Sequence, residues 1–502
     1  MNLVVQKMTG VWPELVLLVG GIICLITGVS KSQTMRKFTV WAAATSLVAA
    51  GLLINLVSIS DHSYNVMSGF VYFFKLAAVF LGLILLMIAA NTPDSVGSNR
   101  QTSPSGEFLP GSAVRGEFFA FFLFSITGLM LTAGAGDLVW LLLALELTSL
   151  PTYIMIALSS RHIDARESSV KYFFLGAVSV AIFLFGFTFI YGATGFTDFD
   201  HIREAIRLDL VNRGGCAPLM LVGLVLAILG ISFKIAAVPM HFHVADVYQG
   251  ASSAVAAFLA FVPKAAGFAA LILLLQLVGS PLPEPVAAML WALAVLTMTV
   301  GNVLALLQDN VKRLLAYSSI AHSGYMLAGL LAGMQVSSGV ASLGNGIAAV
   351  LFYLVAYGLA SSASFAVLSC FADQEREAQT LTDITGLGRR YPLMAGVMIV
   401  SILSLIGLPP LVGFVGKIQL IGSTFQAGFA VLAVILVLNS AVSAAYYLRI
   451  VSACFFSKPS EQIVKLPSAA GQIGAVTAAV FVIYLGMMGG QLVKIALMAV
   501  VP

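Results

Sequence analysis

Charge is what this sequence has least of. Only 9% of its 502 residues are Asp, Glu, Lys or Arg, whereas 60% are hydrophobic, and the mean hydropathy is +1.02. Soluble domains carry about 25% charged residues, so this composition excludes a chain covered by a water-facing polar shell. It indicates a polytopic membrane protein surrounded by lipid.

Cysteines and phosphate-binding loops are scarce as well. The four cysteines (Cys24, Cys216, Cys370 and Cys454) are far apart, without the paired spacing of a zinc or iron–sulfur site. We interpret them as small packing residues. No carboxylate or cysteine clusters with the histidines, and no glycine-rich phosphate loop follows a strand, so we expect no metal, nucleotide or other cofactor on this chain. The net charge of +4 is too small to indicate a nucleic-acid partner.

Long apolar runs are abundant instead. A spanning helix needs about 20 mostly apolar residues, and this rule predicts fourteen segments: 11–30, 38–58, 70–90, 115–135, 137–159, 168–193, 217–250, 252–278, 284–307, 311–333, 345–371, 393–425, 427–455 and 469–498. Two of them, 217–250 and 393–425, are too long for one straight crossing. Both contain proline, which removes a helical hydrogen bond. We therefore expect both to be broken helices.

The broken segments occupy matching places. Segments four to eight and nine to thirteen form two blocks of five, and the fourth member of each block is broken. Because five is odd, the second block enters the membrane from the opposite side, which predicts an inverted repeat with its site near the midplane. The expected fold is an all-α membrane bundle, divided into 1–114 (three helices), 115–278 and 284–455 (the repeats), and 469–502 (a final helix).

Loop charges predict the orientation, because lysine and arginine favour the cytoplasmic side. The odd-numbered loops carry fourteen such residues, namely Lys31, Arg36, Lys37, Arg100, Arg115, Arg161, Arg166, Lys312, Arg313, Arg376, Arg389, Arg390, Lys458 and Lys465; the even-numbered ones carry Arg203, Arg207 and Arg213. We therefore expect both termini on the non-cytoplasmic side of a cell membrane. The polar loops 91–114 and 194–216 are interpreted as connectors, and Val11–Val29 as a retained spanning helix.

A few ionisable residues fall deep inside the predicted segments. Glu146, Lys234, Lys264 and Lys417 are the deepest, and His322 lies midway along segment ten. A lysine or carboxylate at the bilayer centre costs roughly 2.5–3.5 kcal/mol on insertion scales. We therefore expect these side chains inside the bundle, paired or hydrated, as the functional site.

Simpler roles remain open for some of these residues. Lys75, Lys171 and Lys312 lie near segment ends and can extend to the membrane interface. We interpret Lys75 and Lys312 in this way. For Lys171 two interpretations stay open, an interface lysine and a member of the proton path. Glu146 can neutralise a lysine and still belong to a path. His322 is either a packing residue or a proton relay, His241 and His243 are secondary candidates beside the path, and Arg449 is interpreted as an interface anchor.

This set of residues suits proton transfer. Burial favours the neutral form of a lysine, while a nearby carboxylate favours the charged form. Opening and closing a pair such as Glu146 and Lys234 would therefore release and capture a proton, which Lys264 and Lys417 can pass on. Sodium or potassium would instead require a cage of carboxylate and carbonyl oxygens.

Six motifs carry a family resemblance. They are FKIAAVPMHFHVADVYQGA (233–251), FVPKAAGFAAL (261–271), DNVKRLLAYSSIAHSGYMLAGL (309–330), ITGLGRRYP (384–392), SLIGLPPLVGFVGK (404–417) and NSAVSAAYYLRIV (439–451). They closely resemble the subunit N family of proton-translocating NADH:quinone oxidoreductase, respiratory complex I. The likeness runs from about segment three to segment thirteen. One turn departs from the family pattern HFWTPDVYEGAP, because His243, Ala245, Gln249 and Ser252 replace Trp, Pro, Glu and Pro.

The resemblance implies an antiporter-like membrane-arm subunit without a redox centre of its own. It assigns the proton path to Glu146, Lys171, Lys234, Lys264 and Lys417. It also implies a cell inner membrane, subunits M and K as neighbours, and NADH, FMN, iron–sulfur clusters and quinone elsewhere in the complex. Subunit M has a glutamate where this chain has Lys417, which favours subunit N. The alternatives are a stand-alone transporter, the D subunit of a multi-subunit cation/proton antiporter, or a purely structural membrane subunit.

Overall fold

A computed structural model describes residues 10–30, 32–60, 69–90, 115–160, 162–213, 215–335, 345–372, 377–458, 464–465 and 469–500. Several positions used in the sequence analysis lie outside these ranges. They are the loop 91–114 and the cations Lys31, Arg161 and Arg376.

The described chain is almost entirely helical. Eleven of its helices are long and apolar enough to cross a membrane, and three shorter apolar helices accompany them. The only regular β-structure in the described ranges is the antiparallel pairing of two short strands, β1 (Phe371–Ala372) and β2 (Val464–Lys465). The protein is therefore a multi-pass helical membrane protein, and fourteen crossings remain a prediction.

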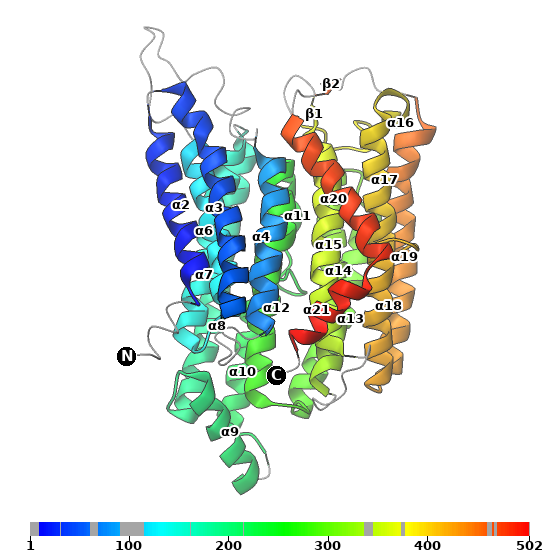
Figure 1. Cartoon of the computed structure of the whole chain (residues 1–502). Helices are drawn as coiled ribbons and strands as arrows, with labels where there is room; N and C mark the ends of the chain where they lie inside the picture. The colour runs from blue at the N-terminus through cyan, green and yellow to red at the C-terminus, as the bar shows by residue number, and fades with distance from the viewer. Residues whose placement is uncertain are drawn as a thin grey trace.

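Most of the helices lie side by side and roughly parallel (Figure 1). The N-terminal part contains α2 (Trp12–Gly28), α3 (Gln33–Ser60) and α4 (Gly69–Ala89); it is followed by α6 (Arg115–Ala133), α7 (Leu138–Ser159), α8 (Ile163–Thr194), α9 (Phe199–Arg213), α10 (Pro218–Ser232), α11 (Val244–Gly250) and α12 (Ser253–Val278). The second half contains α13 (Glu284–Leu306), α14 (Val311–Gln335), α15 (Gly346–Ser369), α16 (Leu387–Arg390), α17 (Pro392–Ile406), α18 (Val412–Gln426), α19 (Ala430–Phe456), α20 (Ala469–Met487) and α21 (Gly490–Met498). Helices α20 and α21 cross the others obliquely, and α9 projects from one end of the bundle (Figure 1).

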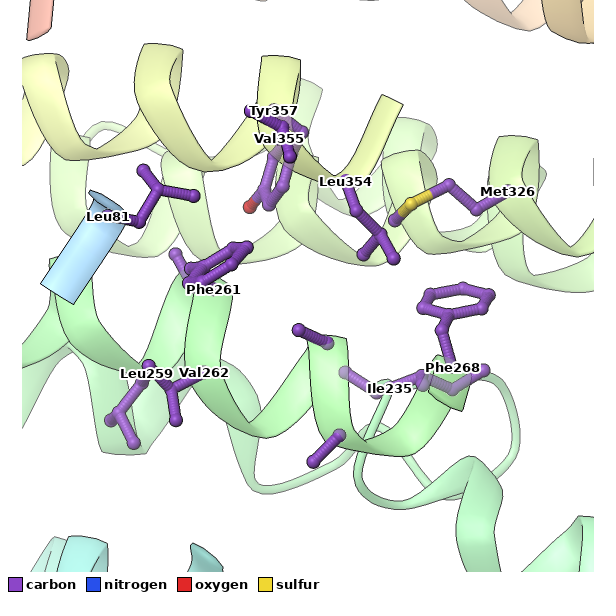
Figure 2. Close-up of a cluster of buried hydrophobic side chains, with 14 of the residues drawn as sticks. Leu81, Ile235, Leu259, Phe261, Val262, Phe268, Met326, Leu354, Val355 and Tyr357 are labelled. Atoms are coloured by element: carbon purple, nitrogen blue, oxygen red, sulfur yellow. The ribbon is translucent and has the colours of Figure 1, made fainter. Parts of the chain in front are cut away.

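Three helices form the centre of the bundle. In the most apolar stretch of each span, 94% of the residues are buried in α12 and α14 and all of them in α15, compared with 33% in α8 and α20. Leu81 of α4, Phe261 of α12 and Leu354 of α15 belong to this core (Figure 2). A charged residue on α12 or α14 is therefore inside protein, whereas α8 and α20 present much of their surface outward.

The first predicted break contains its proline but begins several residues earlier. Helix α10 ends at Ser232, and α11 starts only at Val244, so Lys234 lies within the break and not on a helix ahead of Pro239. Ala236 adopts a positive φ of 59° there, which a helix cannot accommodate. The backbone N–H of Val238 donates to Thr297 Oγ1 of α13 at 3.0 Å, so a neighbouring helix satisfies a group that the break leaves free.

The second break lies where the sequence predicts it. Helix α17 ends at Ile406 and α18 begins at Val412, with Pro409 and Pro410 between them. Gly407 has a φ of 90°, and its N–H donates to the carbonyls of Leu403 and Ser404. This is the left-handed helix ending that glycine favours because it has no Cβ.

One expectation about a single segment was wrong, and one connector has structure of its own. The segment 469–498 is not one helix, because α20 ends at Met487 and a separate helix, α21, begins at Gly490. The predicted connector 194–216 contains the helix α9, which buries Phe199, Ile202 and Ile206 at helical spacing. Its start is capped by Asp198, whose carboxylate accepts the backbone N–H of His201 at 3.0 Å. That hydrogen bond lowers the pKa of Asp198.

Candidate functional site

A buried ion pair joins the first broken segment to α7. Lys234 Nζ lies 3.0 Å from Glu146 Oε1 and donates to Ser149 Oγ at 2.7 Å. Glu146 and Ser149 are three residues apart on α7, so they share a helix face. The Lys234 side chain is 1% exposed and that of Glu146 is 21% exposed. The lysine is thus held inside protein by one charged and one neutral acceptor.

Lys264 lies in the middle of α12 and contacts neutral groups. Its Nζ donates to Ser323 Oγ at 2.9 Å and to the carbonyl of Ser319, both on α14. It also lies 5.5 Å from the centre of the Tyr357 ring. Among the described residues no carboxylate forms an ion pair with Lys264, so its position depends on directional hydrogen bonds.

A small cavity lies between Lys234 and Lys264. Its volume is about 20 Å³, and its lining includes both lysines together with Tyr172, His243 and Tyr248. This volume suffices for about one water molecule. The two lysines therefore border one shared cavity.

His322 connects α14 to two further helices. Its Nδ1 lies 2.7 Å from the hydroxyl of Tyr353 on α15, and its Nε2 lies 3.0 Å from the hydroxyl of Tyr447 on α19. The Tyr447 hydroxyl also hydrogen bonds to Ser318. His322 lies between Ser319 and Ser323 in sequence, so it is adjacent on α14 to the two residues that bond Lys264.

The side chain of Lys417, on α18, reaches back to the second break. Its Nζ donates to the carbonyl of Ile406, the last residue of α17, at 2.8 Å and to Ser440 Oγ of α19 at 2.8 Å. The ammonium also lies 5.2 Å from the centre of the Tyr325 ring, and Tyr325 packs against His322 with ring centres 5.5 Å apart. Lys417 thus satisfies a carbonyl that the break leaves free, and it approaches His322 through Tyr325.

Lys171 is placed differently from the other lysines. Its side chain is 48% exposed, and its Nζ lies 2.7 Å from Glu167 and 3.5 Å from Asp246. Asp246 also accepts a hydrogen bond from Arg313 at 2.7 Å. Lys171 therefore belongs to a charged group around α11, and its role in the path stays a prediction.

The two histidines of the first break are both buried. His243 stacks on Phe233 and Tyr172, with ring centres 4.0 and 5.1 Å apart, and it borders the small cavity. His241 Nδ1 and His243 Nδ1 have no hydrogen-bond partner among the described residues. One position at which this turn departs from the family pattern thus faces the space between Lys234 and Lys264.

The expectation that Lys75 and Lys312 extend to the membrane interface was wrong. Lys75 is buried against Glu14 of α2, with Nζ to Oε1 at 2.7 Å. Lys312 is buried against Glu377, with Nζ to Oε2 at 3.1 Å, and it also donates to the carbonyl of Ala251. Each lysine finds a carboxylate from a distant part of the chain, which sequence position alone does not show.

Sequence reasoning missed both of these carboxylates. Glu14 follows Pro13 in the first turn of an apolar helix, and a carboxylate inside such a run was the available signal. Glu377 lies in a polar loop, where an acidic residue is common and gives no signal. Arg449 of α19 pairs with Asp309 and donates to the carbonyls of Leu306 and Gln308, so it caps the end of α13.

A multi-pass bundle with lysines buried along its middle and two broken helices is the architecture of a membrane protein that translocates ions or protons. A family model described as NADH:quinone oxidoreductase/Mrp antiporter, TM matches residues 135–443. The NADH-quinone oxidoreductase subunit N of Trichlorobacter lovleyi is 37% identical over 458 residues, covering 90% of this chain and 88% of the relative.

Solved structures agree with this family. A chain of respiratory complex I from Thermus thermophilus is 32% identical, with a TM-score of 0.76, and the match covers 96% of this chain and 98% of the other. A chain of the Mrp complex from Dietzia has a TM-score of 0.75 at 18% identity, over 99% and 97% of the two chains, and shows a shared fold alone. The chain belongs to the NADH:quinone oxidoreductase/Mrp antiporter family, in the branch of NADH-quinone oxidoreductase subunit N.

Proposed function

We propose that this chain moves protons across the membrane, as a membrane-arm subunit of an NADH:quinone oxidoreductase, along a buried route through Glu146, Lys234, Lys264, His322 and Lys417. The observation that carries the proposal is the series of contacts among these residues. Lys234 pairs with Glu146 and shares a cavity with Lys264. Ser319 and Ser323, the hydrogen-bond partners of Lys264, flank His322 on α14, and Tyr325 contacts both His322 and Lys417.

Each step changes the charge of one buried amine. With the Glu146–Lys234 pair closed, the carboxylate stabilises the protonated lysine. When the pair opens, desolvation favours the neutral amine, and the proton leaves through the cavity toward Lys264. His322 and the hydroxyls of Tyr353 and Tyr447 then offer hydrogen-bonded groups toward the second half of the molecule. Lys417 is the last amine of the route.

The side chains along this route favour protons over metal cations. Sodium and potassium need several carboxylate or carbonyl oxygens around one ion. The route instead presents three ammonium groups, and in the described part of the chain only Lys234 among them pairs with a carboxylate. A bound cation would be repelled by the lysines, whereas a proton is carried by them.

The relatives are named as subunits of NADH-quinone oxidoreductase, so the chain works as part of an enzyme complex. The NADH, FMN, iron–sulfur clusters and quinone of that complex belong to its other subunits in this proposal, and subunits M and K are the expected neighbours. The family resemblance implies a cell inner membrane, and the loop charges favour both termini on its non-cytoplasmic side. Lys171 would then join the route where α8 meets α11.

A cation/proton antiporter subunit is the second candidate, because the Mrp complex shares the fold. The two candidates differ in their partners. Purification of the tagged chain with its partners, followed by mass spectrometry, separates them: NADH-quinone oxidoreductase subunits support the proposal, and a set of antiporter subunits overturns it.

The function itself is tested by Lys417→Met in the purified complex reconstituted into vesicles. Methionine keeps most of the side-chain volume and removes the charge. We expect a lower number of protons translocated per NADH oxidised, while the complex still assembles. An unchanged ratio would mean that the chain is a structural membrane subunit. Lys494→Met, on the terminal helix α21, is the matched control and should leave the ratio unchanged.

A further inference from the structure

A buried asparagine joins three helices beside Lys417. Asn302 of α13 donates from Nδ2 to the hydroxyl of Tyr325 on α14 at 3.1 Å and to Asn439 Oδ1 on α19 at 3.0 Å. Its Oδ1 accepts a hydrogen bond from the hydroxyl of Tyr446 at 2.9 Å. The side chain uses both its donor and its acceptor group, so its orientation is fixed.

One of these partners contacts Lys417, and a second is next in sequence to a residue that does. The Tyr325 ring lies under the Lys417 ammonium, with 5.2 Å between Nζ and the ring centre. Asn439 immediately precedes Ser440, whose Oγ accepts a hydrogen bond from Lys417 Nζ at 2.8 Å. The Asn302 amide thus bonds one residue that contacts Lys417, Tyr325 on α14, and the residue next to another, Asn439 beside Ser440 on α19.

The position of Lys417 depends on such neutral groups. Within the described chain Lys417 forms no ion pair, and its contacts are a carbonyl, a hydroxyl and an aromatic ring. Hydrogen bonds weaken steeply when their distance and angle change. Small movements of Tyr325 or Ser440 therefore alter how well the charged form of Lys417 is stabilised.

We propose that Asn302 is a positioning residue for the proton path, which holds Tyr325 and Ser440 in the geometry that lets Lys417 take up and release a proton. This inference rests on the proposed function, because it assigns a task to Asn302 only if Lys417 carries protons. A purely structural asparagine, which merely fastens α13 to α19, would have no specific link to Lys417.

A double-mutant cycle separates these two roles, since residues that act through one another show non-additive effects. The variants are Asn302→Leu, which keeps the branched shape and removes the hydrogen bonds, Lys417→Met, and the two together. The measurement is the number of protons translocated per NADH oxidised by the purified complex in vesicles. We expect Asn302→Leu to lower this ratio by at least half of the loss seen with Lys417→Met, and the double variant to equal Lys417→Met alone.

The control is Asn55→Leu. Asn55 of α3 accepts a hydrogen bond from the hydroxyl of Tyr72 on α4 at 3.0 Å, so this change breaks another asparagine–tyrosine contact between helices. It should leave the ratio at its normal value. Should Asn302→Leu fail to assemble, Asn302→Ser provides the same cycle with a smaller polar side chain.

Two results would overturn the inference. One is a normal ratio in the assembled Asn302 variant. The other is a double variant whose ratio falls below that of Lys417→Met by as much as the Asn302 change alone lowers it. A normal ratio in Lys417→Met is a different result. It would refute the proposed function itself and would leave Asn302 with only a packing role.

Discussion

Lys234 and Glu146 form an ion pair whose two members have unequal surroundings. Their charged atoms lie 3.0 Å apart, but the lysine is almost completely enclosed, whereas a fifth of the glutamate side chain is exposed. The lysine therefore depends on the carboxylate for its charge more than the carboxylate depends on the lysine. Because of this asymmetry, replacing Glu146 affects the charge of Lys234 more clearly than replacing Lys234 affects the charge of Glu146.

We expect Glu146→Gln to lower the number of protons translocated per NADH oxidised. Removing one partner of a buried pair costs about 3–5 kcal/mol if the other stays charged, so Lys234 loses its proton instead and cannot deliver one. The measurement is proton uptake into vesicles containing the purified complex. Glu204→Gln, on the exposed surface of α9, is the control, and equal ratios in both variants would exclude a path through Glu146.

The glycine at the second break gives a prediction about geometry. Gly407→Ala forces a Cβ into a left-handed conformation, which costs about 1–2 kcal/mol, and places it 2.9 Å from Lys417 Cδ. We expect lower thermal stability of the complex and weaker proton translocation, because Lys417 must move away from the carbonyl of Ile406.

Gly428→Ala separates the cost of the left-handed backbone from the effect of the clash with Lys417. Gly428 has a φ of 87°, but no heavy atom lies within 4 Å of the position that a Cβ would take there. This variant therefore carries the backbone cost without the clash, and it should reduce stability alone. Equal losses of proton translocation in the two variants would show that displacement of Lys417 is not responsible.

A third prediction concerns Glu377, which holds a lysine at the start of α14. Its carboxylate lies 3.1 Å from Lys312 Nζ and accepts the backbone N–H and hydroxyl of Ser253 at 2.7 Å each. Lys312 is 2% exposed, so Glu377→Gln leaves a buried charge without its counter-ion. We expect a loss of stability of up to about 3 kcal/mol, measured by thermal unfolding of the purified complex.

Glu167→Gln is the comparison for Glu377, because it breaks an exposed pair. Glu167 and Lys171 are 58% and 48% exposed, and exposed pairs contribute about 0–1 kcal/mol. We therefore expect little change in the unfolding temperature. A Glu377 variant that is as stable as the Glu167 variant would contradict the importance that we assign to burial.

The sequence was sufficient to single out most of the lysines of the proposed site. In a chain of so few charges each ionisable residue inside an apolar run is conspicuous, and Lys264 and Lys417 were found in this way. The partners of these lysines were not predictable. Ser319, Ser323 and Ser440 are ordinary helix residues in sequence, and they become hydrogen-bond partners only because α14 and α19 pack beside α12 and α18.

By itself the sequence determined that this protein is a helical membrane bundle, because lipid requires each span to be apolar and to satisfy its own backbone hydrogen bonds. Only the tertiary structure decided that Lys312 is buried against Glu377, that Lys234 lies in the break and not before it, and that Asn302 reaches the surroundings of Lys417. These facts depend on contacts between residues far apart in the chain. Packing creates such contacts, and no local pattern of residues encodes them.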